Sequence, residues 1–115
     1  MEEQVKKFLL EFKGVAVKDG VDTIPRNDTR ATLQYLGLTY KNLQEVLLSL
    51  SVVDFCEGPL KDHSKPGELW VFGKEVKSAE VYIKLKVANV SGVRIAKCIS
   101  FHIPVRPMEY PFRRD

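Results

Sequence analysis

Five side chains in the C-terminal half of the sequence are of the types that cleave or bind a phosphodiester. Tyr82, Lys84 and Lys86 alternate along one stretch, and Ser100 and His102 alternate along the next. Alternation of this kind places residues on one face of a β-strand. A phenol, an imidazole, a hydroxyl and two ammonium groups supply proton donors and acceptors, together with positive charge where a phosphate develops negative charge. The set therefore predicts acid–base chemistry on a phosphodiester, or binding of a nucleic acid.

The same residues have simpler interpretations, which stay open at this stage. A single strand histidine is usually a surface residue, and a row of tyrosine and lysines is usually a solvated sheet face. Trp70 is more often a core residue than a platform for stacked bases. His63, in a polar segment beside Lys61 and Lys65, is more often exposed than chemical. Three observations together make catalysis or nucleic-acid binding as plausible as an inert surface. The side chains share one strand face, they include both proton donors and acceptors, and they lie in the positively charged half of the chain.

Positive charge is concentrated in the second half of the chain. The net charge is +3, with seven Lys and Arg against nine Asp and Glu in residues 1–60, and eleven against six in residues 61–115. A polyanion would therefore bind to the second half, although a solvated surface that leans positive explains the charge equally well. The candidate RNA- or phosphate-binding residues are Lys61, Lys74, Lys86, Arg106 and Arg113.

The first half of the chain has the periodicity and the capping residues of helices. Val5, Phe8, Leu9 and Phe12 follow the spacing of an amphipathic helix. Gly14 and Gly20 then bracket a short Val-rich segment. The predicted elements are a helix over residues 2–13, an edge strand over residues 21–25, a helix from Asn27–Thr29 to Gly37 and a third helix capped by Thr39.

The period then changes to that of β-strands. The predicted elements are a polar loop over residues 56–67, a covered strand from Glu68, a strand over residues 80–87, a turn over residues 89–92 and a strand over residues 93–103. Alternation in the last strand predicts an apolar face of Val93, Ile95, Ile99, Phe101 and Ile103, and an opposite face of Arg94, Ala96, Cys98, Ser100 and His102.

These elements predict a single α+β domain over residues 1–115. Its N-terminal helices pack on one face of a C-terminal antiparallel β-sheet, because the apolar strand face needs a cover that the helices supply. The helical part covers about residues 1–55 and the β-meander about residues 68–103. Residues 104–115 form an extended tail, since three prolines interrupt it.

Several classes of protein are disfavoured by the sequence. No apolar run approaches the ~20 residues of a membrane span, so we expect no membrane partner. The N-terminus has no apolar segment of an export signal, which favours a cytoplasmic location with Cys56 and Cys98 as free thiols. Two cysteines and two histidines do not match a spaced zinc signature. We therefore expect neither a metal nor another cofactor.

Five short motifs occur in the order and spacing of a known family. They are Gly37-Leu38-Thr39, Leu50-Ser51, Asp54-Phe55, Val81-Tyr82-Ile83-Lys84 and Ile99-Ser100-Phe101. Over roughly residues 35–103, the chain resembles the motility quorum-sensing regulator (MqsR-type) toxins, which belong to the RelE-like RNase toxins. The resemblance implies a RelE-like fold and the toxin of a bacterial type II toxin–antitoxin system. Such a toxin is a metal-free endoribonuclease, or mRNA interferase. It cleaves messenger RNA, free or on the ribosome, by attack of a 2′-hydroxyl on the adjacent phosphate. A cognate antitoxin protein holds it inactive.

The resemblance also implies roles for individual residues. Tyr82 matches a tyrosine of the family's active site. His102 stands where the better-known members carry a lysine, and histidine is well suited to donate a proton near pH 7. The leading hypothesis makes His102 the general acid, with Tyr82 and Lys84 positioning and neutralising the scissile phosphate and Ser100 in support.

The base that activates the 2′-hydroxyl is left open between Glu68 and Tyr82, and Trp70 is a supporting candidate. The family's glutamine after the tryptophan corresponds to Val71. Its role is therefore vacant in this chain, or it passes to Glu68 or Lys74.

Glu57 stands where the family has a loop lysine, which Lys61 could replace from the same loop.

Two alternatives to an active toxin remain. The first alternative is a non-catalytic module that binds RNA or a protein with the same face. The second is a degenerate toxin retained for antitoxin binding. His102 discriminates between enzyme and binding module, because an acid–base enzyme needs a titrating group there and a binding module needs only charge.

Overall fold

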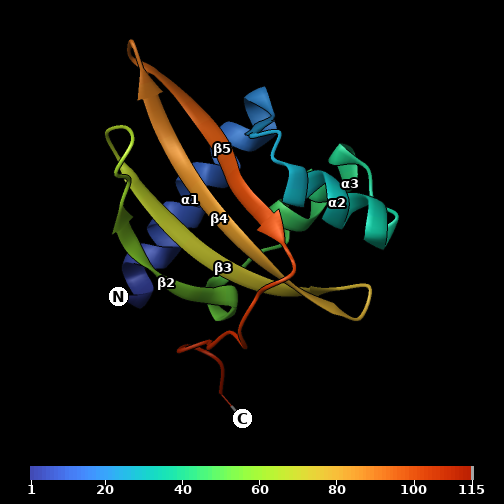
Figure 1. Cartoon of the computed structure of the whole chain (residues 1–115). Helices are drawn as coiled ribbons and strands as arrows, with labels where there is room; N and C mark the ends of the chain where they lie inside the picture. The colour runs from blue at the N-terminus through green and yellow to red at the C-terminus, as the bar shows by residue number, and fades with distance from the viewer. Residues whose placement is uncertain (115) are drawn as a thin grey trace.

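Three helices and a five-stranded sheet make up the chain, which confirms the predicted α+β class (Figure 1). The computed structural model describes residues 1–114, so Asp115 of the predicted tail lies outside the described residues. The elements are α1 (Glu2–Asp19), β1 (Val21–Thr23), α2 (Asn27–Leu36), α3 (Tyr40–Leu48), the short 3-10 helix η1 (Val52–Asp54), β2 (Phe55–Lys61), β3 (Glu68–Val76), β4 (Ala79–Val90) and β5 (Val93–His102).

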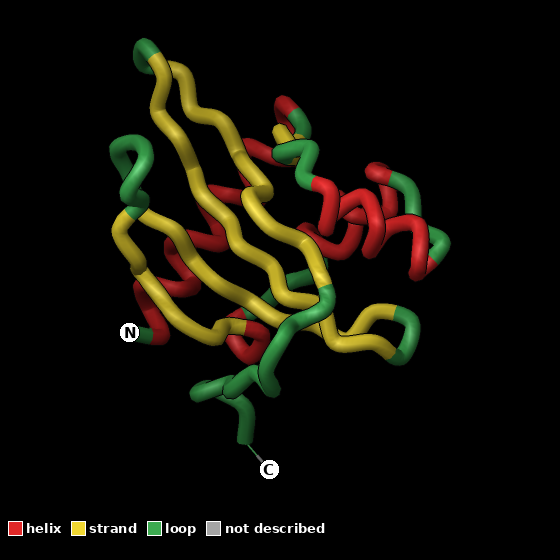
Figure 2. The backbone as a smooth tube through the Cα atoms, viewed as in Figure 1, coloured by secondary structure: helices red, strands yellow, loops and turns green. Residues whose placement is uncertain are grey.

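The strands lie in the order β1-β5-β4-β3-β2. The meander β3 to β5 is antiparallel, as predicted, and β2 adds an antiparallel strand to its edge that was not predicted. The edge strand predicted near residue 21 is also present, but it pairs with β5 in the parallel direction, so the sheet is mixed and not purely antiparallel. A parallel pair needs a long crossover connection. Here the chain leaves β1, runs through α2, α3 and β2 to β4, and then returns as β5 to pair with β1 (Figure 2).

Helix α1 crosses behind the sheet and covers one face of it (Figure 1). Its predicted apolar stripe is buried, and it packs on the core of the sheet. The helix continues past residue 13, where the prediction ended it, because Ala16 extends the buried stripe beyond Gly14. Gly20, at φ 80°, ends it. The other side of the sheet, which no helix covers in Figure 1, is called the open face below.

Helix α2 ends and helix α3 begins at the predicted capping residues, whereas α2 begins after Arg26 and not at a cap formed by Asn27, Asp28 or Thr29. Gly37 adopts the left-handed conformation after α2, at φ 69°. Thr39 accepts a hydrogen bond from the Asn42 backbone nitrogen at 3.1 Å, and the Asn42 side chain accepts one from the Thr39 backbone at 3.0 Å. This reciprocal pair satisfies N–H groups that a helix start leaves unpaired. Both predicted helices are therefore confirmed.

Strand β2 corrects the prediction of a loop over residues 56–67. Gly58 and Pro59 indicated a turn, but they lie inside an edge strand whose pairing with β3 is irregular on both sides of Glu57. An edge strand needs only one row of hydrogen bonds, so it tolerates a proline. The true loop is shorter and joins Lys61 to Glu68.

Candidate functional site

The centre of the candidate site is a stacked pair of rings on the open face. Tyr82 of β4 lies directly opposite His102 of β5. Their ring centroids are 4.8 Å apart and the planes differ by 15°. The neighbouring pair is Lys84 opposite Ser100, and the Lys84 ammonium lies 5.8 Å from the centroid of the Tyr82 ring. The predicted convergence of these four side chains is present in the structure, while their chemical roles stay predictions.

A β-bulge in β5 sets which residues share this face. Lys84 pairs with Ser100 and Leu85 pairs with Cys98, so Ile99 is an extra residue in the ladder. An extra residue shifts the alternation of side chains. The predicted faces of residues 93–99 are therefore wrong. Ala96 and Cys98 are buried in the helix-side core, whereas Lys97 and Ile99 lie with Lys84 on the open face.

The environment of the two rings favours distinct roles. Burial, and then the negative charge of Glu57, raise the pKa of Tyr82. Its phenol therefore stays protonated near neutral pH and is suited to donating a hydrogen bond rather than to acting as a base. The His102 Nδ1 lies 3.0 Å from the Ile103 carbonyl oxygen. Because a carbonyl only accepts, Nδ1 carries the proton of this contact, and Nε2 is left to exchange a proton with a ligand.

A hollow of about 560 Å³ opens over the stacked rings, and we call it the tyrosine hollow. Tyr82, Lys84, Ser100 and His102 all line it, together with Glu57 and Arg26. Ser100 is only 4% exposed, so it supports the floor more than it offers a contact. Across the sheet, Glu57 pairs with Val71, Val71 pairs with Lys84, and Lys84 pairs with Ser100.

The C-terminal tail forms one wall of the tyrosine hollow with residues 104–109. It is held at Gly73, where a Cβ would overlap the Tyr110 hydroxyl and come within 2.9 Å of the Met108 sulfur. The Tyr110 hydroxyl donates to a Glu80 carboxylate oxygen at 2.7 Å. Residues 104–114 of the predicted tail form no helix or strand; they bend at residues 105–106, turn at residues 111–112 and pack against the open face.

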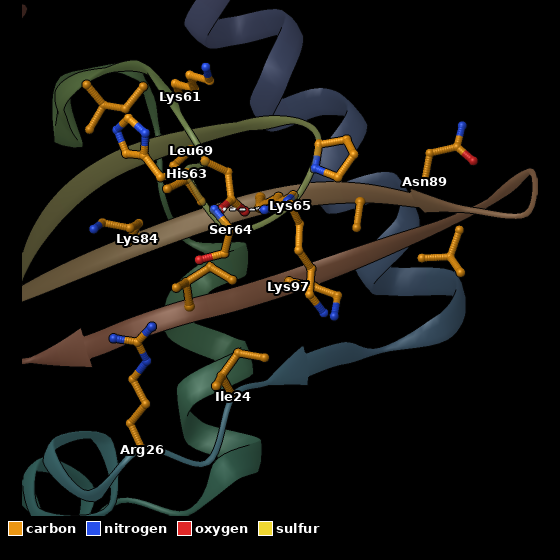
Figure 3. A pocket seen from close by; sticks show the side chains of 17 residues that line it. Ile24, Arg26, Lys61, His63, Ser64, Lys65, Leu69, Lys84, Asn89 and Lys97 are labelled. Carbon is orange, nitrogen blue, oxygen red and sulfur yellow. Dashed lines mark hydrogen bonds and ion pairs between the residues drawn. The ribbon is translucent and has the colours of Figure 1, made fainter.

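A second hollow of about 690 Å³ lies beside the first, and we call it the lysine hollow. Arg26 and Lys84 line both. The loop between β2 and β3 folds over one side of it (Figure 3). There the Lys86 ammonium, whose side chain is 4% exposed, lies 2.6 Å from a carboxylate oxygen of Asp62. Asp62 also accepts hydrogen bonds from the backbone nitrogens of Ser64 and Lys65.

This ion pair makes the stability of the chain depend on pH. The hydrogen bond from Lys86 is the main cause that lowers the pKa of Asp62 from 3.8 to about 2. A carboxyl whose pKa is lower in the folded state stabilises that state above its unfolded pKa, and the contribution disappears as the pH falls through the folded value. We therefore expect Asp62→Asn to lower the free energy of unfolding near pH 6 and to have little effect near pH 2, in urea denaturation at a series of pH values.

Lys86→Met is the matched control, since it removes the other member of the pair and leaves an apolar side chain. In the Lys86→Met background, the pH-dependent effect of Asp62→Asn should be smaller, and the remainder belongs to the backbone nitrogens of Ser64 and Lys65. An effect as large as in the wild-type background would mean that Lys86 is not the main group that holds the Asp62 carboxylate.

The other predicted site residues are distributed over several places. Of the five candidate cations, Lys61 and Arg106 line the hollows, and Lys86 is engaged by Asp62. Lys74 and Arg113 lie 3.6 and 3.2 Å from the buried carboxylate of Asp54. The structure therefore does not bring Lys74 and Arg113 to the tyrosine hollow.

Two further candidates lie away from the stacked rings. Trp70 is in the core, stacked on Phe8 of α1 with ring centroids 4.9 Å apart, which bears out the core interpretation. Glu68 lines a hollow on the α1 side of the sheet, together with Phe8 and Trp70. Neither residue lines either of the hollows on the open face.

Arg26 is the residue at the site that sequence reasoning missed. It precedes α2 and has no pattern of its own, and only the parallel pairing of β1 brings it beside β5. Glu57 departs from the loop lysine of the family, and it lies in β2 opposite Val71 and not in the predicted loop.

Among residues 1–114, no three His, Cys, Asp or Glu side chains gather as metal ligands would. Within the same residues, no helix combines the length and the apolar character that a membrane span requires. Comparison of the sequence with protein-family models and with curated proteins gives no match.

Proposed function

We propose that this chain is an endoribonuclease that cleaves messenger RNA without a metal, as the toxin of a bacterial type II toxin–antitoxin pair. The observation that carries the proposal is the Tyr82–His102 stack, flanked by Lys84 on an open sheet face. This set joins a proton-transfer group, a neutral hydrogen-bond donor and a cation within one hollow. The resemblance to the MqsR-type toxins supports the same assignment.

The reaction is an internal transfer at phosphorus. The 2′-oxygen forms a bond to the phosphorus as the bond from phosphorus to the 5′-oxygen breaks. His102 gives a proton to the departing 5′-oxygen from Nε2, and Lys84 and Tyr82 stabilise the charge on the non-bridging oxygens. The products are a 2′,3′-cyclic phosphate and a 5′-hydroxyl.

The base that takes the proton of the 2′-hydroxyl is best supplied by Glu57. The raised pKa of Tyr82 disfavours the phenol as a base, and Glu68 does not line the tyrosine hollow. Glu57 does line the tyrosine hollow, and its negative charge contributes to the raised pKa of Tyr82. In a cell, a cognate antitoxin would keep this activity in check.

Purified protein should cut a single-stranded RNA in the presence of EDTA and leave a 2′,3′-cyclic phosphate with a 5′-hydroxyl. The reason is that the proposed groups supply both proton transfer and positive charge. Mass spectrometry of the fragments identifies the ends, and a 2′-O-methylated copy of the RNA, which lacks the attacking group, is the control. Cleavage of the methylated copy, or a strict need for a divalent ion, would refute the mechanism. Binding without cleavage would favour the non-catalytic module.

A further inference from the structure

The lysine hollow combines an apolar floor with a cationic rim. Its floor includes the side chains of Leu60, Leu69, Ala88 and Ile99. Lys61 at the end of β2 and the loop residues His63, Ser64 and Lys65 stand on one side of it, and Ile24 and Arg26 stand on the other (Figure 3). A volume of about 690 Å³ lies in the range of hollows that hold small ligands, roughly 300–1,000 Å³.

Most of the rim charge is not neutralised by the protein. Lys86 is paired with Asp62, and Lys97 lies 3.2 Å from Asp22. Asp62 is the lone carboxylate among the lining residues. The lining cations that form no ion pair within residues 1–114 are Arg26, Lys61, Lys65 and Lys84. Such a hollow fits a ligand that has a flat apolar part and a negative charge.

The two hollows are joined at Arg26 and Lys84, which line both. A ligand that places a phosphate at this junction therefore has the tyrosine hollow on one side and the lysine hollow on the other. A polynucleotide has this repeating form, with a phosphate between successive bases. An unpaired base can enter a hollow, whereas a base inside a duplex is stacked and paired.

We infer that the lysine hollow binds the base and sugar of one unpaired nucleotide, and that this nucleotide adjoins the phosphate held at Arg26 and Lys84. The inference rests on the proposed function in one respect, because it assumes that the RNA continues from this nucleotide toward Tyr82 and His102. It adds a second nucleotide site and restricts the substrate to single-stranded segments. Lys61 and Lys65 would contact the phosphate on the far side of the bound nucleotide.

The test measures binding apart from cleavage, with a labelled, fully 2′-O-methylated RNA decamer as the probe. Fluorescence anisotropy at several salt concentrations gives the dissociation constant and its salt slope. The single strand should bind at least tenfold more tightly than the same decamer annealed to its complement. Each phosphate neutralised on a single strand contributes ~0.7 to the slope, and Lys61 and Lys65 share one phosphate, so the Lys61→Ala/Lys65→Ala double variant should lose about 0.7.

Two further variants separate the hollow from general charge. Lys18→Ala/Lys41→Ala removes the same charge from exposed positions on α1 and α3 and should leave affinity and slope close to wild type. Ala88→Phe places a ring in the floor of the lysine hollow, and it should weaken binding at least tenfold while the salt slope stays unchanged.

The outcomes distinguish the inference from the proposed function. Unchanged binding in both Lys61→Ala/Lys65→Ala and Ala88→Phe would overturn the inference, even if His102→Ala stopped cleavage. Equal affinity for single strand and duplex would overturn it as well. Weaker binding in both variants, with no cleavage by the wild type in any buffer, would support the nucleotide site and refute the nuclease.

Discussion

Replacing His102 by alanine should lower the rate of RNA cleavage about 10²- to 10⁴-fold, the usual effect of removing a general acid. The melting temperature should stay within a few degrees of wild type. His102 is half-buried on the open face, and its side-chain contacts are the stack on Tyr82 and the hydrogen bond to the Ile103 carbonyl. Its loss opens no cavity in the helix-side core, so stability should change by about 0.5 kcal/mol or slightly more.

Single-turnover cleavage of a labelled RNA, together with thermal denaturation, checks this expectation. His102→Lys should keep part of the activity, since the better-known toxins that the chain resembles carry a lysine there. Tyr35→Ala is a control, because Tyr35 is an exposed aromatic residue of α2 outside both hollows. Cleavage by His102→Ala at the wild-type rate would show that the active face has been assigned wrongly.

The parts of the fold that sequence alone predicted are those with local causes. Thr39 caps α3 by hydrogen bonds to a residue three positions away, and Gly37 ends α2 by its own backbone conformation. The face of β4 could be assigned because Tyr82 and Lys84 belong to an uninterrupted alternation. Signals of this kind depend on neighbours in sequence, so they can be read before the tertiary structure is known.

The parts that sequence did not predict depend on distant neighbours. Pro59 reads as a loop residue, and only the position of β2 at the sheet edge makes it acceptable in a strand. The partners of Lys86 and Lys74 are 24 and 20 positions away in sequence. No local pattern shows that these two lysines are engaged by carboxylates, whereas Lys61 forms no ion pair within residues 1–114.

The bulge at Ile99 is the most consequential of these differences, because it decides which residues of β5 before Ser100 lie on the open face. Uninterrupted alternation would place Ile99 and Phe101 together in the core. In the structure Phe101 is fully buried opposite Ile83, whereas Ile99 is half-exposed in the floor of the lysine hollow. The two residues should therefore respond very differently to truncation.

Phe101→Ala should lower the free energy of unfolding by about 3–5 kcal/mol, the usual loss for a buried phenylalanine. Ile99→Ala should cost at most about 1 kcal/mol. Folding removes only part of the Ile99 side chain from water, so its truncation loses only part of the free energy of burial. Urea denaturation of both variants measures these losses. Phe101→Leu, which keeps an apolar side chain of similar size, should recover most of the stability lost in Phe101→Ala.

The comparison between the two truncations is sharper than either value. If Ile99→Ala costs as much as Phe101→Ala, β5 has no bulge, and Lys97 with Ile99 would turn away from the lysine hollow. The floor proposed for the bound base would then be lost, while the Tyr82–His102 pair, which lies beyond the bulge, would remain. If Ile99→Ala is nearly neutral and weakens RNA binding, the bulge both defines the core and presents Ile99 to the nucleotide.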